Sequence, residues 1–255
     1  GGRRTGRSWN AVSRRLRHLF RVIAVDVRGH GDSGSSIQGN DSLGRMKDLA
    51  NVVKSLQLEE HYLMVHSLGS LPGARYAAQY QDKVKGLFMI EPIPEGFRHW
   101  VRVGTFDEDG VDQGQKRRNG WENINVLKGR LETNKQTKKW SREVLEDILK
   151  YETEVDSDGH VSIKWHPSVY NIEEMRKDTF SLLEESPNIT SPTLLMVCDD
   201  NPLVASHFNL IAEKIPNIKY VIVNGLGHAI YMEEPDLIAD YAVSFFLDGK
   251  LPNED

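Results

Sequence analysis

Five short apolar runs divide the chain: Val22 to Val25, Tyr62 to Val65, Leu87 to Ile90, Leu194 to Val197 and Val221 to Val223. Each run is continuous rather than alternating, which is typical of parallel strands covered on both faces. Helical patterns lie between several of the runs. The sequence therefore predicts an α/β fold with an open, mostly parallel sheet.

Apolar residues recur every three or four positions in the segments 9–19 and 46–56, as expected for amphipathic helices. Asp41 or Ser42 is the expected N-cap of the second helix. The alanines of the segment 74–78 indicate a helix with a small face that can pack close to the sheet. Pro235 is expected to open a last helix, which stops near Gly249.

Residues 95–190 interrupt this rhythm. They are polar and helix-prone, and they hold four of the five tryptophans, namely Trp100, Trp121, Trp140 and Trp165. An insertion of this length between two strands is too long for a loop. We therefore expect a core formed by residues 1–94 and 191–255, with 95–190 as a helical cap over the carboxyl ends of the strands, where ligands bind in such sheets. The tryptophans either line a pocket or form the cap's own small core.

Composition narrows the class of protein. Of 255 residues, 39% are hydrophobic and 27% charged, and the net charge of −5 argues against nucleic acid as the main partner. Cys198 is the only cysteine, so an internal disulfide is excluded and a cytoplasmic location is favoured. No apolar run is long enough to span a membrane. The sequence shows no metal-ligand cluster or phosphate-binding glycine loop, so no cofactor and no metal are predicted.

Ser67 is the most informative residue of the chain. It comes directly after the apolar run Tyr62 to Val65 and His66, and small residues that can open a helix follow it. A serine at a sharp turn from strand to helix exposes its hydroxyl, with a helix N-terminus behind it. This placement suits a nucleophile.

A serine hydroxyl needs a base that accepts its proton. His228 follows the last predicted strand in a glycine-containing loop, and it is the best candidate. His66 is expected to point away from the nucleophile. The base in turn needs an acid, and Asp200 lies between Ser67 and His228 in the chain order expected for this arrangement.

Three motifs in this order resemble the α/β-hydrolase superfamily, in particular its capped esterases and C–C hydrolases. The segment 26–33 resembles the Asp-x-Arg-Gly-His-Gly-x-Ser loop of these enzymes, His66 to Gly69 most of the nucleophile elbow, and Gly225 to His228 the histidine loop. The resemblance covers about residues 1–95 and 190–250. It implies a catalytic triad and a structural role for the charged residues of the segment 26–33.

The chain departs from the family pattern at two points of the site. Val65 replaces the first glycine of Gly-x-Ser-x-Gly, so a small neighbour such as Gly73 or Ala74 must make room for it. The family aspartate usually stands where this chain has Asn201. Asp200 is the favoured acid, with Asn201 and Glu91 as alternatives; Glu91 ends the third apolar run.

The beginning of the chain is the third departure. The resemblance implies an oxyanion loop here, so Gly2, or else Gly1, would supply one backbone N–H and Leu68 the other. The family strand that precedes this loop, between the strands of Val22 and Tyr62, is missing. Without it a parallel sheet would leave backbone groups unpaired, and we expect the chain to be a fragment of a longer one.

These features predict a serine hydrolase that cleaves a small-molecule carboxylic ester with an apolar acyl part. A C–C bond hydrolase with the same triad is the first alternative, because the cap pocket would decide between the two. A non-catalytic ligand-binding homologue is the second. The sequence does not determine the oligomeric state.

Overall fold

The computed structural model describes residues 2–96, 120–166, 169, 172–201, 203–252 and 254. Its centre is a four-stranded parallel sheet with the strand order β1-β2-β6-β7. The strands are β1 (His61–His66), β2 (Val84–Ile90), β6 (Thr193–Cys198) and β7 (Ile218–Val223). Four of the five apolar runs are thus strands of one parallel sheet, and the predicted fold class is confirmed.

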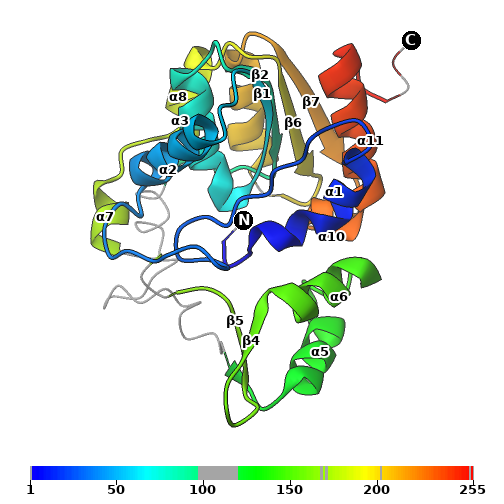
Figure 1. Ribbon diagram of the computed structural model, residues 1–255. Helices are drawn as coiled ribbons and strands as arrows, with labels where there is room; N and C mark the ends of the chain where they lie inside the picture. Colours follow the sequence, from blue (N-terminus) through cyan, green and yellow to red (C-terminus); the bar gives the residue numbers. More distant parts are fainter. Residues whose placement is uncertain are drawn as a thin grey trace.

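The continuous apolar pattern follows from helices on both faces of the sheet (Figure 1). In β2, Leu87 and Met89 pack with residues of α2 (Ser42–Ser55) and α3 (Ser70–Gln79). Phe88 and Ile90 pack with α1 (Asn10–Leu16) and α11 (Pro235–Val243) on the other face. All four side chains have no exposed surface. Neither face of this strand therefore has room for a polar side chain.

The prediction of a strand at Val22 to Val25 is wrong. This segment belongs to none of the strands, and Val22, Ile23 and Val25 are 38–39% exposed. A parallel strand needs a neighbour that pairs with its backbone groups. Within the described residues β1 pairs only with β2, so the segment has no ladder to join.

The predicted helices are present, with shifted ends. The first is the 3-10 turn η1 (Gly6–Trp9) followed by α1, and it stops before Leu19, which is 58% exposed. Asp41 caps α2 by accepting the Gly44 N–H through Oδ1 at 2.7 Å. After α9 (Asn209–Lys214) and α10 (Ile230–Glu233), α11 continues into η6 (Ser244–Asp248). Gly249, with φ 67°, ends that helix as predicted.

The inserted segment lies beyond the carboxyl ends of the strands (Figure 1). Its described helices are α5 (Ile124–Thr133), α6 (Arg142–Tyr151) and α7 (Ile172–Lys177), and α8 (Leu182–Glu185) leads back to the core. It also holds a small antiparallel sheet of the order β3-β5-β4, formed by Gly120–Trp121, Val161–Ile163 and Thr153–Val155. Strands of two or three residues are too short for a periodic signal, so the sequence did not predict this sheet. Trp100 lies outside the described residues.

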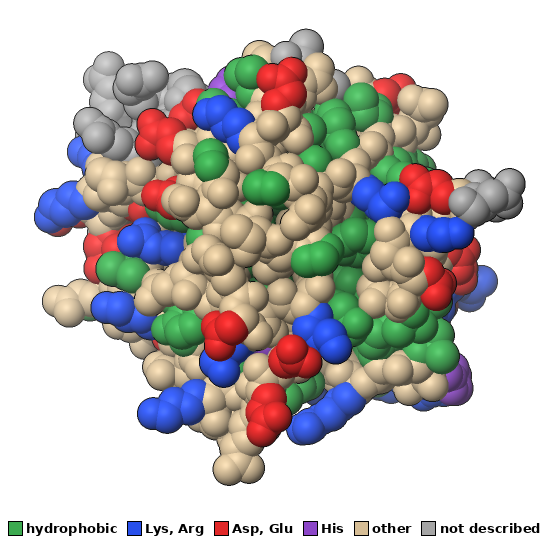
Figure 2. Space-filling model, turned by 90° about the horizontal axis from the view of Figure 1, so that it is seen from above, with side chains coloured by type: hydrophobic (Ala, Val, Ile, Leu, Met, Phe, Trp, Pro, Cys, Tyr) green, Lys and Arg blue, Asp and Glu red, His purple; other side chains and the backbone are tan. Residues whose placement is uncertain are grey.

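The molecular surface carries charges of both signs. On the face in Figure 2, Lys and Arg side chains alternate with Asp and Glu, without a large area of one sign. Among the described residues, no helix is long and apolar enough to cross a membrane.

Gly73 in α3 makes room for the side chain of Val65, as the departure from the elbow motif required. A Cβ added at Gly73 would lie 2.5 Å from Val65 Cγ1, well inside van der Waals contact. Val65 is only 7% exposed and therefore has little space to move. The missing glycine of the elbow, at position 65, is thus compensated by a glycine eight residues further along the chain.

We expect Gly73→Ala to destabilise the protein by up to about 2 kcal/mol, because overpacking costs about 1–3 kcal/mol and the gain in helix propensity offsets about 1 kcal/mol of it. In a Val65→Ala background the same change should be neutral or stabilising, because Cγ1 is gone. Urea denaturation of the four proteins of this double-mutant cycle measures the coupling. Additive effects would show that the two positions do not compete for space.

Candidate active site

Ser67 stands at the carboxyl end of β1, in the sharp turn predicted for it. Its φ of 51° is a left-handed conformation that non-glycine residues rarely adopt, and the side chain is 6% exposed. A single 3-10 turn (Ser67–Gly69) leads into α3. The Ser70 hydroxyl donates to the Ser67 carbonyl at 2.6 Å and accepts the Ile93 N–H at 2.9 Å. Through Ser70, the turn at Ser67 is therefore hydrogen-bonded to the segment that follows β2.

Glu91 follows β2 as Ser67 follows β1. Because His66 pairs with Ile90 in the sheet, Ser67 and Glu91 leave the two strands at the same level. Glu91 also has a left-handed backbone, with φ 46°, and is 1% exposed. Its carboxylate accepts the Cys198 N–H through Oε1 at 2.6 Å and the Asn201 side-chain amide through Oε2 at 2.7 Å. These neutral donors stabilise a buried negative charge.

His228 joins the serine to this carboxylate. Its Nε2 lies 2.9 Å from Ser67 Oγ, and its Nδ1 lies 2.9 Å from Glu91 Oε2. A carboxylate only accepts, so Nδ1 carries the proton and the Nε2 lone pair faces the serine hydroxyl. Gly225, with φ 75°, supplies the turn that brings the loop from β7 over the sheet edge.

His66 supports the backbone of His228. Its Nε2 lies 2.8 Å from the His228 carbonyl oxygen, and the two rings are 4.8 Å apart between centroids. Burial holds the pKa of His66 well below its usual range, so the ring is neutral and donates from Nε2. His66 is thus bound to the loop that carries His228.

The acid is where the geometry departs most from the sequence prediction. Asp200 is exposed, and none of the hydrogen bonds among the described residues joins it to His228. The partner of His228 Nδ1 is Glu91, one of the two alternatives. Asn201, the other, donates to Glu91 and accepts the Leu203 N–H through Oδ1 at 3.0 Å. In the loop after β6, the Asn201 side chain therefore contacts Glu91, whereas Asp200 is exposed.

The model of one protein family, described as the alpha/beta hydrolase fold, matches residues 4–235 of the chain. The chain belongs to the α/β-hydrolase family.

Known relatives of this α/β hydrolase cleave several kinds of bond. The sn-1-specific diacylglycerol lipase ABHD11 of Mus musculus is 23% identical over 228 residues, which are 88% of this chain and 71% of the lipase. A soluble epoxide hydrolase of Corynebacterium sp. is 24% identical over 259 residues, with 93% and 85% covered. The crystal structure of E-2-(acetamidomethylene)succinate hydrolase superimposes with a TM-score of 0.78 at 20% identity, over 96% of this chain and 88% of that one. The two sequence relatives support hydrolase activity and leave the cleaved bond open, and the solved structure supports the fold.

The two residues predicted as oxyanion donors lie in different segments of this α/β hydrolase. Leu68 directly follows Ser67 in the elbow and is 6% exposed. Gly2 begins a turn in the first segment, which runs between the sheet and the inserted segment (Figure 1). Gly1 lies outside the described residues. The role of both N–H groups stays a prediction.

The loop 26–33 of this hydrolase has the structural contacts that its resemblance implies. Arg28 forms a bidentate pair with Asp48 at 2.5 and 2.7 Å. Asp26 and His30 accept backbone N–H groups of the first segment, from Gly6 and Arg3. The loop therefore connects the beginning of the chain to the core.

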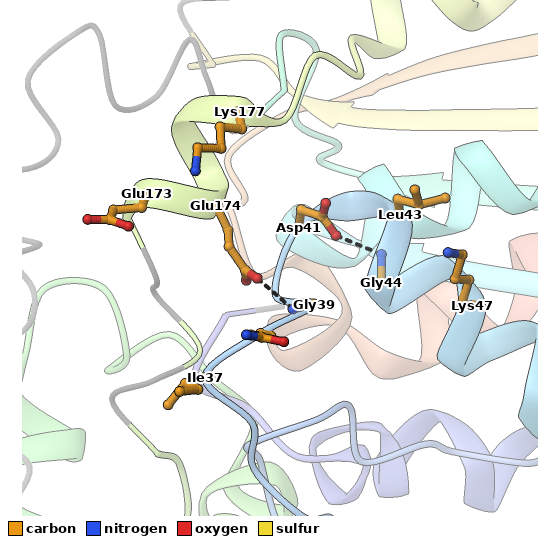
Figure 3. Close-up of a pocket in the computed structure, with 10 residues that line it drawn as sticks. Ile37, Gly39, Asp41, Leu43, Gly44, Lys47, Glu173, Glu174 and Lys177 are labelled. Carbon is orange, nitrogen blue, oxygen red and sulfur yellow. Dashed lines mark hydrogen bonds between the residues drawn. The ribbon is translucent and has the colours of Figure 1, made fainter.

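Two other groups of polar residues lie apart from Ser67, His228 and Glu91. A surface hollow of about 550 Å³ is lined by the segment 37–47 and by α7, with charges of both signs such as Lys47 and Glu174 (Figure 3). None of its lining residues is Ser67, His228 or Glu91. Asp156, Asp158 and His160 have the spacing of metal ligands, but they are exposed in a hairpin whose turn Asp156 closes by accepting two backbone N–H groups. Neither group suggests a role in the chemistry of Ser67.

Proposed function

We propose that this α/β hydrolase cleaves small carboxylic esters by acyl transfer, with Ser67 as nucleophile, His228 as general base and Glu91 as the acid in place of Asp200. The observation that carries the proposal is the continuous hydrogen-bonded chain from Ser67 Oγ through His228 to Glu91. This connectivity is the one that activates a serine toward an acyl carbon.

In the acylation step, Ser67 Oγ attacks the ester carbonyl carbon while His228 Nε2 takes the hydroxyl proton. The carbonyl π electrons move to oxygen, where the N–H groups of Leu68 and Gly2 stabilise the negative charge. The tetrahedral intermediate collapses, the carbon–oxygen bond to the alcohol breaks, and the alcohol oxygen takes the proton from His228 Nε2.

In the deacylation step, water attacks the acyl-serine and His228 Nε2 takes one of its protons. Collapse of the second intermediate releases the acid and returns the proton to Ser67 Oγ. In both steps Glu91 keeps Nδ1 protonated and stabilises the transient imidazolium. No external reactant other than water is needed.

A C–C hydrolase would use the same three residues, and the shape of the pocket under the inserted segment would decide between the two bonds. The diacylglycerol lipase among the relatives favours the ester. The contact of Ser67 Oγ with His228 Nε2 favours an enzyme over a homologue that only binds a ligand, because it places a base beside the serine hydroxyl.

Intact-mass analysis after labelling with a fluorophosphonate probe tests this proposal. The folded protein should gain one adduct, because the probe phosphonylates an activated serine and releases fluoride. The Ser67→Ala variant should gain none. An unlabelled, well-folded wild-type protein, or an adduct that survives in Ser67→Ala, would rule out Ser67 as the nucleophile.

A further inference from the structure

Four non-glycine residues have a left-handed backbone in the described part of the chain: Arg3, Gln57, Ser67 and Glu91. Such a conformation persists only where the surroundings impose it, and it gathers at functional sites. Ser67 and Glu91 belong to the proposed triad. Gln57 follows the C-cap of α2, a common place for a left-handed residue. Arg3, with φ 60°, has neither explanation.

The backbone of Arg3 is held by His30. The Arg3 N–H donates to His30 Nε2 at 3.1 Å, and His30 Nδ1 lies 3.0 Å from the Arg28 carbonyl oxygen. A carbonyl only accepts, so Nδ1 carries the ring proton and Nε2 offers its lone pair to Arg3. His30 is 2% exposed, and burial lowers its pKa to about 4, which keeps the ring neutral near pH 7.

The loop 26–33 forms a second contact with the first segment, at Gly6. The Gly6 N–H donates to Asp26 Oδ1 at 2.6 Å. A Cβ at Gly6 would lie 2.9 Å from the Ala24 carbonyl oxygen, so the backbones touch too closely for a side chain. Residues 3–6 are therefore anchored at both ends, directly after Gly2.

We infer that His30 is a positioning residue for the oxyanion site, because it holds Arg3 in the left-handed conformation that sets the direction of the Gly2 N–H. The inference rests on the proposed function, in which Gly2 supplies the second donor. The Arg3 N–H is bonded to His30 and cannot be that donor. A change in the φ angle of Arg3 would move Gly2 relative to the anchored residues 3–6. Gly2 therefore keeps its position only while Arg3 keeps its left-handed conformation.

Two substitutions at position 3 separate the backbone from the side chain. Both Arg3→Gly and Arg3→Pro remove the guanidinium, which lies 5.0 Å from the Trp165 ring centroid. Glycine keeps the N–H and adopts a positive φ readily, whereas proline has no N–H and fixes φ near −65°. Arg3→Pro should have a kcat about 10- to 100-fold below that of Arg3→Gly, because a misplaced group near the reacting atom costs this much.

His30→Leu and His30→Gln repeat the test from the other side of the hydrogen bond. The glutamine amide oxygen can accept the Arg3 N–H, whereas leucine cannot, so His30→Leu should show the larger loss of kcat. The readouts are kcat and KM for p-nitrophenyl acetate and the inhibition constant of phenylboronic acid, whose tetrahedral adduct places an oxygen in the oxyanion site. The inhibition constant should rise with the fall in kcat, while KM changes less than about threefold.

A purely structural role would change thermal stability and leave the boronate affinity of the folded protein as it was. Equal kcat and boronate affinity for Arg3→Pro and Arg3→Gly would overturn the inference, and so would wild-type values in folded His30→Leu. Fluorophosphonate labelling of the wild-type protein separates a failure of the proposed function from a failure of the role inferred for His30. If it labels at Ser67 and the variants do not differ, only the role of His30 is wrong; if it does not label, the proposed function is wrong and this inference with it.

Discussion

Replacing Ser67 or His228 by alanine should lower kcat for p-nitrophenyl acetate by about 10⁴- to 10⁶-fold, because each change removes an essential part of one proton-transfer unit. The double variant should be no slower than the slower of the single variants, since residues that act as a unit do not have additive effects. Steady-state kinetics measures the loss, and the thermal midpoint checks that each variant is folded.

Ser206 provides a matched control. Its hydroxyl lies 2.8 Å from His207 Nδ1, and His207 Nε2 lies 3.3 Å from a Glu95 carboxylate oxygen, so a second serine, histidine and carboxylate meet in this protein. Ser206, however, is exposed and is not among the left-handed residues. Ser206→Ala should keep wild-type kcat. Near-wild-type turnover in Ser67→Ala or His228→Ala would contradict the proposed mechanism.

The contrast between the two serines shows why the contact between Ser67 and His228 could be expected from the sequence. Each is placed by its immediate neighbours: Ser67 by the strand before it and the small residues after it, and His228 by the last strand and its glycines. A local pattern is sufficient for a residue whose position depends on a single strand and turn.

The carboxylate beside His228 Nδ1 was not the one that the sequence favoured. The carboxylate of Glu91 is held by Cys198 and Asn201, which are 107 and 110 residues further along the chain. Only the pairing of β2 with β6 brings them together. Spacing within the loop after β6 favoured Asp200, and nothing local to that loop indicates that the carboxylate in contact with His228 follows another strand.

The prediction of a strand at residues 22–25 was wrong for a related reason. Its apolar pattern is that of a strand buried on both faces, but strand formation depends on a neighbouring backbone as well as on side chains. In the described residues β1 pairs only with β2, and the segment has no regular secondary structure and is exposed. An apolar run of this kind therefore forms a strand only where another backbone is available to pair with it.

Glu91→Gln should lower kcat by about 10³- to 10⁴-fold, because an amide can donate to Nδ1 and so favour the tautomer that lacks an Nε2 lone pair. Asp200→Asn should stay within about threefold of wild type, because Asp200 has no hydrogen bond to His228. Kinetics of the two variants decides between the acid seen in the geometry and the one favoured by sequence. A large loss in Asp200→Asn with little loss in Glu91→Gln would show that the loop after β6 carries the acid.

The contact between Asn201 and Glu91 allows a stricter test. Asn201 Nδ2 lies 2.7 Å from the Glu91 oxygen that His228 contacts, so Asn201→Asp alone puts two carboxylates in one site, where they share a proton and cannot both ionise. That variant should lose activity near neutral pH. The double variant Glu91→Gln/Asn201→Asp again has one carboxylate and one amide, with their places exchanged, and should be at least about tenfold faster than Glu91→Gln. Rescue would show that the site needs one negative charge beside His228 Nδ1 and accepts it from either strand, whereas a double variant as slow as Glu91→Gln would tie the function to the position of Glu91 itself.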